Sequence, residues 1–499
     1  MSEIKKLAGQ TLWYGIPTIA SRFLGYLMNL SLPLLFAQPA VTADLTQIYA
    51  IIPFLNVLFT YGLETAYFRF SKEEDPKKLY STLSISLIGS TLLFTAILFY
   101  FSASITQFAN LEAHPEYINW MIGIIFFDAI STLAFAKLRQ DNRPKKYATV
   151  RLSSVLVNMV AVILFIGYIP SYVQLYPESS LVFFTKNNIG IGYYLIGNMA
   201  GSLLTFILLF KELKQIQFYF SKAIWIKIMH YSYPLIIVGM GGMINDILSR
   251  LIYQHIVDLP AEAAKHELGI FGNIYRLAVL ITILIQAFRM AAEPFFFKQK
   301  GVENAQKTYA RVMKFFVIAC CYMFLFISLF IEVFAWFFEA INKPLWVQGL
   351  NIVPMLALGN IFLGIYYNLS IWYKLTDKNN YGAAITIAGA IITIGLNILL
   401  IPTYHYLGAA LATFFCYFFM MMVSYYLGQR YYPVPYATKK IIAYMVVVCL
   451  LYGLHKTILY FLPHLWLGIL LGIVFIGLFS MLVAWAEKKE LIALRQRHL

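Results

Sequence analysis

Among the ionisable side chains inside the long apolar stretches of this sequence are nine arginines and acids. A charge at the centre of a bilayer costs about 2.5–3.5 kcal/mol on the insertion scale, so such residues are candidates for function. They are Arg22, Glu64, Arg69, Asp128, Asp246, Arg250, Arg276, Arg289 and Glu293. Four of the deeper ones are arginines, whose planar guanidinium binds phosphate oxygens through paired hydrogen bonds. The set indicates recognition of an anionic headgroup.

The spacing of these residues separates two groups. Asp246 and Arg250, like Arg289 and Glu293, are four residues apart, which places each pair on one helix face. Charge neutralisation within the helix, which helps it to enter the membrane, is the simpler interpretation of both pairs. Arg69 and Glu293 lie near helix ends, where they act as interfacial anchors.

Arg22 and Arg276 have no oppositely charged residue within one turn of their own helix. A buried arginine needs an anion, and Asp128, Asp246 or a bound ligand would supply one. Ligand contact and an ion pair to another helix both stay open. We assign to substrate binding Arg22, Arg276, Arg289 and Arg250, and to a charge network or coupling Glu64, Asp128, Asp246 and Asn397.

About fourteen apolar stretches must position these residues, and each has the roughly 17–25 residues that cross a bilayer as a helix. The sequence therefore predicts an all-α polytopic membrane protein. The stretches are 11–36, 47–70, 80–103, 117–136, 152–169, 189–210, 228–253, 270–297, 315–338, 352–373, 383–401, 409–427, 441–462 and 465–486.

Basic residues fall almost wholly on alternate loops between these stretches. Of the 38 lysines and arginines, 29 lie at the two ends of the chain or in the loops after even-numbered helices. Only Lys186, Lys265, Lys343 and Lys456 lie in the other loops, and the remaining five are arginines inside helices. By the positive-inside rule, both termini are expected in the cytoplasm.

Composition supports the membrane class and argues against several others. Hydrophobic residues make up 61% of the chain and charged residues 12%, whereas a soluble domain is about 25% charged. The net charge of +15 sits in short loops, where it sets topology and contacts anionic lipids, so nucleic acid is not an expected partner. The four cysteines lie in apolar stretches without any paired spacing, which argues against disulfides and metal sites.

Nothing in the sequence indicates an enzyme. The eight histidines are scattered, and there is no HExxH, no serine–histidine–aspartate grouping and no glycine-rich phosphate loop. We expect no cofactor and no resident metal. The loops expected outside the membrane are short, which limits any chemistry there.

Helices 1–6 and 7–12 read as two related halves. Helix 1 opens with Tyr14–Pro17 and helix 7 with Tyr231–Pro234, each with a proline a few residues into the span. Asn158 in helix 5 corresponds to Asn397 in helix 11. Six helices separate the copies, so this is a parallel repeat about an axis along the membrane normal, with the transport site between the halves. The predicted divisions are lobes at 1–226 and 227–430, then an appended helix pair and tail at 431–499.

Several short motifs occur in the order and topology of one family. The chain resembles the Wzx-type polysaccharide repeat-unit flippases of the multidrug/oligosaccharidyl-lipid/polysaccharide exporter superfamily, a resemblance that covers nearly its whole length. The motifs are Gly62–Phe70, Phe127–Ala129, Phe135–Arg139, Asn142–Pro144, Ala287-Phe288, Pro294-Phe295, Asn397, Ile401-Pro402 and Gly408–Ala410.

This resemblance implies a MATE-like fold and a specific activity. The protein would move an undecaprenyl-pyrophosphate-linked oligosaccharide from the inner to the outer leaflet of the bacterial cytoplasmic membrane by alternating access. Membrane potential, or a sodium or proton gradient, would drive transport. The lipid-linked substrate and membrane lipids would be its partners, together with polysaccharide polymerase and glycosyltransferases.

Three other functions stay open. The lipid II flippases of the same superfamily also append two helices, and Arg276-Leu277 and Ser21-Arg22 resemble their motifs; however, Met28 and Asn29 stand where they have an acid. A multidrug cation exporter needs an acidic helix 1, which here carries Arg22. A membrane polymerase or ligase needs a sizeable exterior loop. Some relatives bind sodium through helices 7 and 11, where Asp246 and Asn397 are available but Ile401 replaces a second acid.

Overall fold

The computed structural model is mainly helical in the part of the chain that it describes, with no strand among those residues. The described residues are 20, 23–25, 27–28, 32–36, 38–71, 73–141, 143–186, 189–299, 303–376, 378–488 and 490. Two compact units form, one from residues 1–273 with 386–409 and the other from 274–385 with 410–499. Two long helices, α14 (Ala261–Gln299) and α19 (Asn379–Tyr431), contribute to both units.

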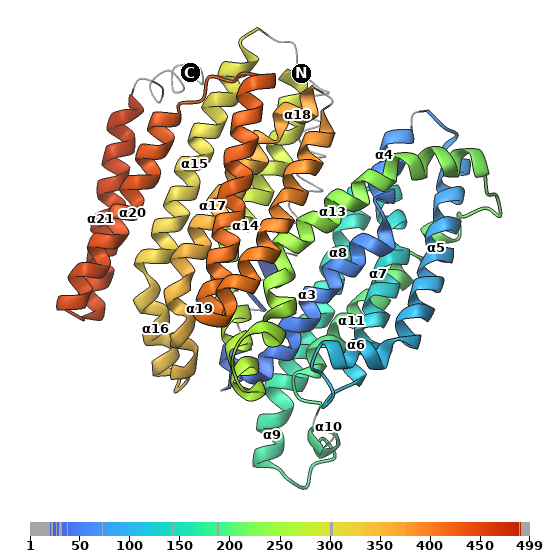
Figure 1. Cartoon of the computed structure of the whole chain (residues 1–499). Helices are drawn as coiled ribbons and strands as arrows, with labels where there is room; N and C mark the ends of the chain where they lie inside the picture. Colours follow the sequence, from blue (N-terminus) through green and yellow to red (C-terminus); the bar gives the residue numbers. More distant parts are fainter. Residues whose placement is uncertain are drawn as a thin grey trace. The chain divides into compact units, whose positions relative to one another are not determined.

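The first unit holds the N-terminal helices (Figure 1). Its members, besides parts of α14 and α19, are α2 (Leu32–Leu35), α3 (Ala40–Thr60), α4 (Leu63–Phe70), α5 (Pro76–Tyr100), α6 (Ser102–Phe108), α7 (Glu116–Gln140), α8 (Pro144–Val162), the π-helix η1 (Ile163–Tyr168), α9 (Ile169–Leu175), α10 (Val182–Lys186), α11 (Gly192–Leu208), α12 (Phe210–Leu213) and α13 (Lys222–Ile256). The second unit adds α15 (Ala305–Leu329), α16 (Ile331–Ala340), the 3₁₀ helix η2 (Pro344–Ile352), α17 (Val353–Leu369), α18 (Ile371–Leu375), α20 (Thr438–Phe461) and α21 (Leu465–Ala486).

Glycines allow close helix packing in the first unit. Helix α11 packs along α8 and α7. A Cβ at Gly201 would lie 2.6 Å from the backbone oxygen of Ser154 in α8, and one at Gly197 would lie 2.7 Å from the amide oxygen of Asn158. Because lipid tails give no hydrophobic drive for helix association, such close backbone approach stabilises membrane bundles by dispersion.

Helix ends follow local sequence signals. The Asp75 carboxylate accepts hydrogen bonds from the amides of Lys77 and Lys78 at the start of α5, where Pro76 occupies the first helical position. Between α3 and α4 the chain turns through Tyr61 and Gly62, both with positive φ (32° and 73°). The second expected span is therefore two helical segments, with a glycine where the backbone is left-handed.

In the second unit, α14 bends by 45° between Ala278 and Leu280. The Nδ2 of Asn360 in α17 donates to the Ala278 carbonyl at 3.0 Å. A bend frees backbone carbonyls from the helix ladder, and in a membrane each needs another donor. A buried asparagine in the neighbouring helix supplies it here.

Helices α20 and α21 form an antiparallel pair at the C-terminal end of the second unit, beside α15 (Figure 1). Their attachment to α15 is polar. The ammonium of Lys314 lies 2.5 Å from Glu487 and 2.7 Å from Glu490, and the same Glu487 carboxylate binds Lys440 at 2.9 Å and the Tyr444 hydroxyl at 2.7 Å. Burial alone would raise the pKa of Glu487, but the hydrogen bonds from Lys314, Tyr444 and Lys440 lower it below its ordinary value.

Ten helices in the described residues are long and apolar enough to cross a membrane, or eleven when the bent α14 is counted as one span. Helix α11, at 17 residues, corresponds to the sixth expected span, and most of the first expected span lies outside the described residues. Spans 11 and 12 are expected as separate helices, and α19 consists of two helices that meet at a kink at His405, whose backbone is non-helical (φ 54°, ψ −135°). The total of fourteen and the cytoplasmic position of the termini stay predictions.

The predicted lobes at 1–226 and 227–430 also stay a prediction. The compact units divide the chain differently, because α13 and residues 386–409 join the N-terminal helices. Contacts between α13 and α3 account for much of this, including a hydrogen bond from Gln47 to the Leu251 carbonyl at 2.9 Å.

Candidate substrate site

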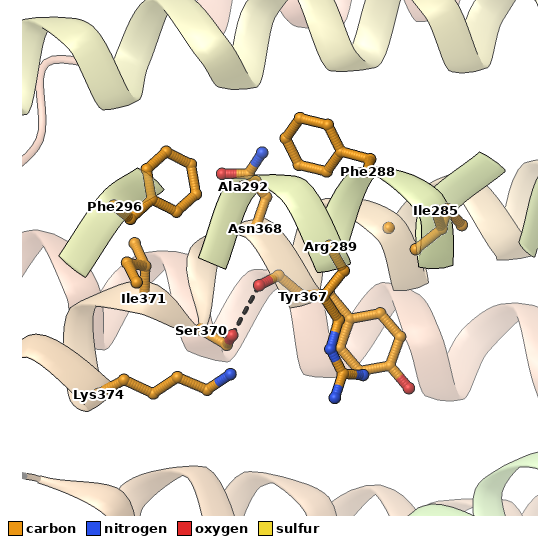
Figure 2. A pocket seen from close by; sticks show the side chains of 11 residues that line it. Ile285, Phe288, Arg289, Ala292, Phe296, Tyr367, Asn368, Ser370, Ile371 and Lys374 are labelled. Atoms are coloured by element: carbon orange, nitrogen blue, oxygen red, sulfur yellow. Dashed lines mark hydrogen bonds between the residues drawn. The ribbon is translucent and has the colours of Figure 1, made fainter. Parts of the chain in front are cut away.

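A pocket of about 330 Å³, including the part open to solvent, lies in the second unit between α14 and the α17–α18 segment (Figure 2). Two cations and several polar groups share it with aromatic and aliphatic side chains. Its lining is Ile285, Phe288, Arg289, Ala292 and Phe296 from α14, with Gly364, Tyr367, Asn368, Ser370, Ile371 and Lys374.

Local structure positions the two cations of this pocket. The Arg289 guanidinium lies 4.8 Å from the centre of the Tyr367 ring, and a face-on cation of this kind is held by the ring's electron density. The chain turns at Ser370, whose hydroxyl donates to the Tyr367 carbonyl at 2.6 Å. That turn separates α17 from α18 and sets Lys374 one turn into the second segment. Figure 2 shows the charged ends of Arg289 and Lys374 on the same side of the pocket.

Asn368 lies in the same pocket and is 96% buried, with a relative exposure of 4%. Neither its amide nitrogen nor its amide oxygen has a hydrogen-bond partner among the described residues. A buried amide without partners is destabilising by about 1–3 kcal/mol, so native proteins keep few of them. The pocket therefore offers an unsatisfied donor and an unsatisfied acceptor.

A second region of interest lies in the first unit, where α3 meets the first turns of α14. The Lys265 ammonium binds the buried Asp44 carboxylate at 2.7 Å, and the Asn273 amide donates to the Thr42 hydroxyl at 2.6 Å. A Cβ at Gly272 would lie 2.1 Å from the Thr46 hydroxyl, so no larger residue fits without movement. Both helices begin on the side that the charge pattern places outside.

The same side of the unit carries a cluster around Glu267. The Tyr253 hydroxyl donates to Glu267 at 2.5 Å, and Nδ1 of His405 lies 3.1 Å from both carboxylate oxygens. His405 is the residue whose non-helical backbone interrupts α19. The cluster therefore connects the break in α19 at His405 to the last turn of α13 and the first turns of α14.

The structure places the expected arginines in different surroundings. Arg22 lies outside the described residues. Arg276 is half-buried on α14, just before the bend, and makes interactions. Arg289 lines the pocket. Glu293, its expected partner, has a side chain outside the described part, so that pairing stays a prediction.

Arg250 and Asp246 lie on one face of α13, as their spacing predicts. The carboxylate of Asp246 is 3.9 Å from the guanidinium, and Arg250 also donates to the Asp246 backbone carbonyl at 3.0 Å. The structure thus brings together the pair that neutralises charge within the helix.

The remaining acids have partners within the first unit. Glu64 lies 2.5 Å from Arg139, and this ion pair joins the first turn of α4 to the last turn of α7. The Asp128 carboxylate lies within the electrostatic influence of the Ser202 hydroxyl and the Arg151 guanidinium. Both acids therefore belong to polar networks between helices.

Asn397 lies in a polar chain between α13 and α19, and the residue of α13 that joins this chain, through Thr393, is Asn245 rather than Asp246. Asn245 donates to the Thr386 carbonyl at 3.2 Å and accepts from the Thr393 hydroxyl at 3.2 Å. Asn397 donates to the Thr393 carbonyl at 2.7 Å, and its amide oxygen has no partner among the described residues. No group of three histidine, cysteine, aspartate or glutamate side chains suited to a metal occurs in the described part of the chain.

Sequence reasoning missed Asn368, Lys374, Asn245 and the Asp44–Lys265 pair. Lys374 reads as a loop cation and Asp44 as the flank of an apolar span. A search for charged residues within apolar spans does not find asparagines, because their side chains are uncharged. A search for asparagine within apolar spans, as was made for Asn158 and Asn397, would have found Asn245, Asn360 and Asn368.

The fold is that of a known class of membrane transporter. The chain matches the structure titled "Lipid II flippase MurJ, inward closed conformation" with a TM-score of 0.67 at 16% identity, over 96% of this chain and 99% of that one. It matches an inward-facing multidrug resistance MATE family transporter of the MOP superfamily with a TM-score of 0.64 at 12% identity, over 88% and 99%. An outward-facing MATE transporter matches with a TM-score of 0.58 at 13% identity, over 87% and 96%.

These likenesses show that the chain has the fold shared by lipid II flippase MurJ and the MATE transporters, and its apolar helices indicate a multi-pass membrane protein. The model of the family described as "Polysaccharide biosynthesis protein" matches residues 7–300, more than half of the chain. The chain belongs to this family. No curated protein sequence gives a match. The solved structures that share its fold are a lipid II flippase and multidrug transporters.

Proposed function

We propose that the protein flips a polyprenyl-pyrophosphate-linked oligosaccharide, the repeat unit of a surface polysaccharide, from the inner to the outer leaflet. The observation that carries the substrate class is the match to the polysaccharide biosynthesis family over residues 7–300. The transporter fold supports movement across the membrane rather than a chemical reaction.

Physical chemistry explains why such a cargo needs a protein. A hydroxyl that enters hydrocarbon without a hydrogen-bond partner costs about 4–8 kcal/mol on alkane scales, so an oligosaccharide crosses unaided at a negligible rate. Arginine side chains replace water around the pyrophosphate, while the polyprenyl tail stays in lipid. The pocket cations Arg289 and Lys374, with Arg22, Arg250 and Arg276, are the groups proposed for this role.

The packing in the first unit supports alternating access. The Asp44–Lys265 ion pair and the Gly272–Thr46 contact lock α3 against the start of α14. We assign these contacts to the exterior side, where they close the path and leave the cytoplasmic side as the entrance. Outward passage requires them to separate, and contacts at the other side must then form.

A lipid II flippase is the second candidate, because the fold likeness to lipid II flippase MurJ extends over 96% of this chain, whereas the MATE likenesses reach 87–88%. The two candidates differ in which cell envelope polymer fails when the protein is removed. Loss of surface polysaccharide with normal growth supports the first, and rescue of a strain depleted of its lipid II flippase supports the second.

The direct test is transport by the purified protein in sealed vesicles. We expect a lipid-linked repeat unit to become accessible in the opposite leaflet only when the protein is present. Arg276→Ala should lose this activity, and surface polysaccharide in cells, while the protein still inserts at normal levels. Full activity of Arg276→Ala would remove this residue from the site.

A further inference from the structure

The pocket between α14 and the α17–α18 segment offers a ligand two different kinds of group. One side offers cations, and the buried part offers an amide whose two polar atoms lack partners among the described residues. In Figure 2 the Asn368 amide lies near Phe288 and Phe296, on the opposite side of the view from the charged ends of Arg289 and Lys374. A ligand that satisfies both must carry an anion at one end and hydroxyl groups at the other.

Asn368 is unusual when compared with the other buried asparagine of the same helix. Asn360 is 1% exposed, and its amide donates to the Ala278 carbonyl at the bend of α14. The Asn368 amide makes no such hydrogen bond to a backbone carbonyl in the described part of the structure, although it is buried nearly as deeply. Its amide stabilises nothing in the described part of the structure, so a ligand group is the partner that explains its presence.

The cationic side suits phosphate. A guanidinium and an ammonium at one edge of a pocket bind phosphate oxygens through charge-assisted hydrogen bonds, which are about twice as strong as neutral ones. Tyr367 fixes the plane of Arg289, and the turn at Ser370 brings Lys374 to the same edge. Each cation can bind phosphate and keep other contacts, because a guanidinium carries five N–H donors and an ammonium three.

The aromatic walls suit the ring of a sugar. Small-molecule sites are lined mainly by apolar and aromatic side chains, with a few polar groups that fix orientation. Phe288 and Phe296 supply such walls beside Asn368. Gly364 packs closely against two neighbours, because a Cβ there would lie 2.9 Å from Phe316 and 3.0 Å from Ile285, so a larger residue would displace Ile285 from the pocket wall.

We propose that this pocket binds the headgroup of a phosphorylated sugar lipid, with phosphate oxygens at Arg289 and Lys374 and a hydroxyl of the first sugar at Asn368. The proposal rests on the proposed function and adds the place where the cargo is recognised. The pocket lies at the ends of α14 and α17 that the charge pattern assigns to the cytoplasm, so it selects cargo at loading.

The experiment compares binding of two lipids to the purified full-length protein. One is undecaprenyl pyrophosphate, and the other is the same lipid carrying a single sugar. We expect Asn368→Leu to weaken binding of the sugar-bearing lipid about tenfold, which matches one lost hydrogen bond, and to leave the bare lipid unaffected. Arg289→Gln and Lys374→Gln should weaken both lipids about tenfold or more. Lys378→Gln, which alters a nearby cation outside the pocket, is the charge control.

Thermal unfolding supplies the control for folding. Without ligand, Asn368→Leu should keep or raise the unfolding midpoint, because it removes an unsatisfied amide. Asn360→Leu should lower it, because the Ala278 carbonyl then loses its donor. A lower midpoint for Asn368→Leu would contradict the proposal, since it would show that the amide already stabilises the unliganded protein.

Competition separates the sources of phosphate. Displacement by phosphatidylglycerol as readily as by the sugar-bearing lipid would show a general lipid headgroup site and overturn the proposal. Inorganic pyrophosphate that displaced as readily as the sugar-bearing lipid would also overturn it, because the site would then not recognise the sugar. Equal binding of both lipids by wild type and Asn368→Leu would also overturn it. In each case transport by the wild-type protein would still support the proposed function, and only the absence of transport would remove that.

Discussion

The carboxylate of Asp44 lies 2.7 Å from the ammonium of Lys265, although Asp44 is only 7% exposed. The pair joins the first turn of α3 to the first turns of α14, beside the Thr42–Asn273 hydrogen bond. A buried carboxylate that loses its cation is strongly destabilised. The pair therefore holds these helices together until both charges are resolvated, as opening of a gate requires.

Gly272→Val tests this gate. A Cβ at this position would lie 2.1 Å from the Thr46 hydroxyl, so the larger residue forces α14 away from α3. Overpacking of this kind destabilises by about 1–3 kcal/mol. We expect a lower thermal midpoint, and faster labelling of an introduced Asn273→Cys by a membrane-impermeant maleimide added outside.

Gly242→Val is the matched control for the gate, because nothing lies within 4 Å of a Cβ at Gly242. Its labelling rate and midpoint should equal those of the wild type. Equal labelling in the Gly272→Val and Gly242→Val proteins would show that this packing does not control access from the outside.

Asn245 provides a second test, of stability rather than access. Asn245→Ala leaves the Thr393 hydroxyl and the Thr386 carbonyl without this partner, which should reduce the free energy of unfolding by about 1–3 kcal/mol. Asp246→Ala removes an ion pair at 3.9 Å from a carboxylate whose side chain is 47% exposed, and should change the free energy of unfolding by less than about 1 kcal/mol. Chemical unfolding in detergent measures both, and the reverse order would contradict the assignment of Asn245 to the helix contact.

The comparison of Asn245 with Asp246 shows how much of the site can be predicted from the sequence. Hydropathy and charge asymmetry predict the class and the helices, because the bilayer imposes strong constraints on length and polarity. Spacing predicts the Asp246–Arg250 pair because both residues lie on one helix. Contacts between helices depend on how each helix is rotated, and one residue of rotation decides whether Asn245 or Asp246 meets α19.

The pocket was predicted only through Arg289. Its other polar members come from α17 and α18, and their convergence depends on the turn at Ser370 and on the packing of α17 against α14. The interruption of α19 at His405 was likewise not separable from an ordinary loop, because Pro402 and Gly408 both indicate the end of a helix. Motif resemblance, in contrast, correctly indicated the family that the match over residues 7–300 shows.

Glu487 gives a test that depends on pH. Its pKa is lowered in the folded protein, so its contribution to stability is present at neutral pH and is lost as the pH falls through that lowered value, below the ordinary 4.5. We expect hydrogen-exchange protection of α21 to be constant from pH 7 to pH 5 and to fall below about pH 4.5. Glu487→Gln should remove this dependence.

The same substitution has a defined effect at neutral pH. Glu487→Gln deprives Lys314, which is 3% exposed, of one of its two carboxylates, and Glu490 remains at 2.7 Å. A loss of about 3 kcal/mol or less in unfolding free energy is expected, because removal of one partner of a buried pair costs about 3–5 kcal/mol when no other partner remains. Glu332→Gln, which breaks the more exposed pair with Lys456, should cost under about 1 kcal/mol. Equal effects would contradict the anchoring role of the Lys314 cluster.

Membrane potential should power transport, because the proposed cargo is an anion that moves outward from a negative interior. Each charge gains about 2.3 kcal/mol per 100 mV, which corresponds to about fiftyfold accumulation per charge. Vesicles with a potassium-clamped potential, negative on the side of loading, should accumulate flipped lipid in proportion to the voltage. Collapse of the voltage should leave only equilibration between leaflets, and Arg276→Ala vesicles should show neither process. Undiminished accumulation after the voltage and all ion gradients are abolished would show that another energy source drives the protein.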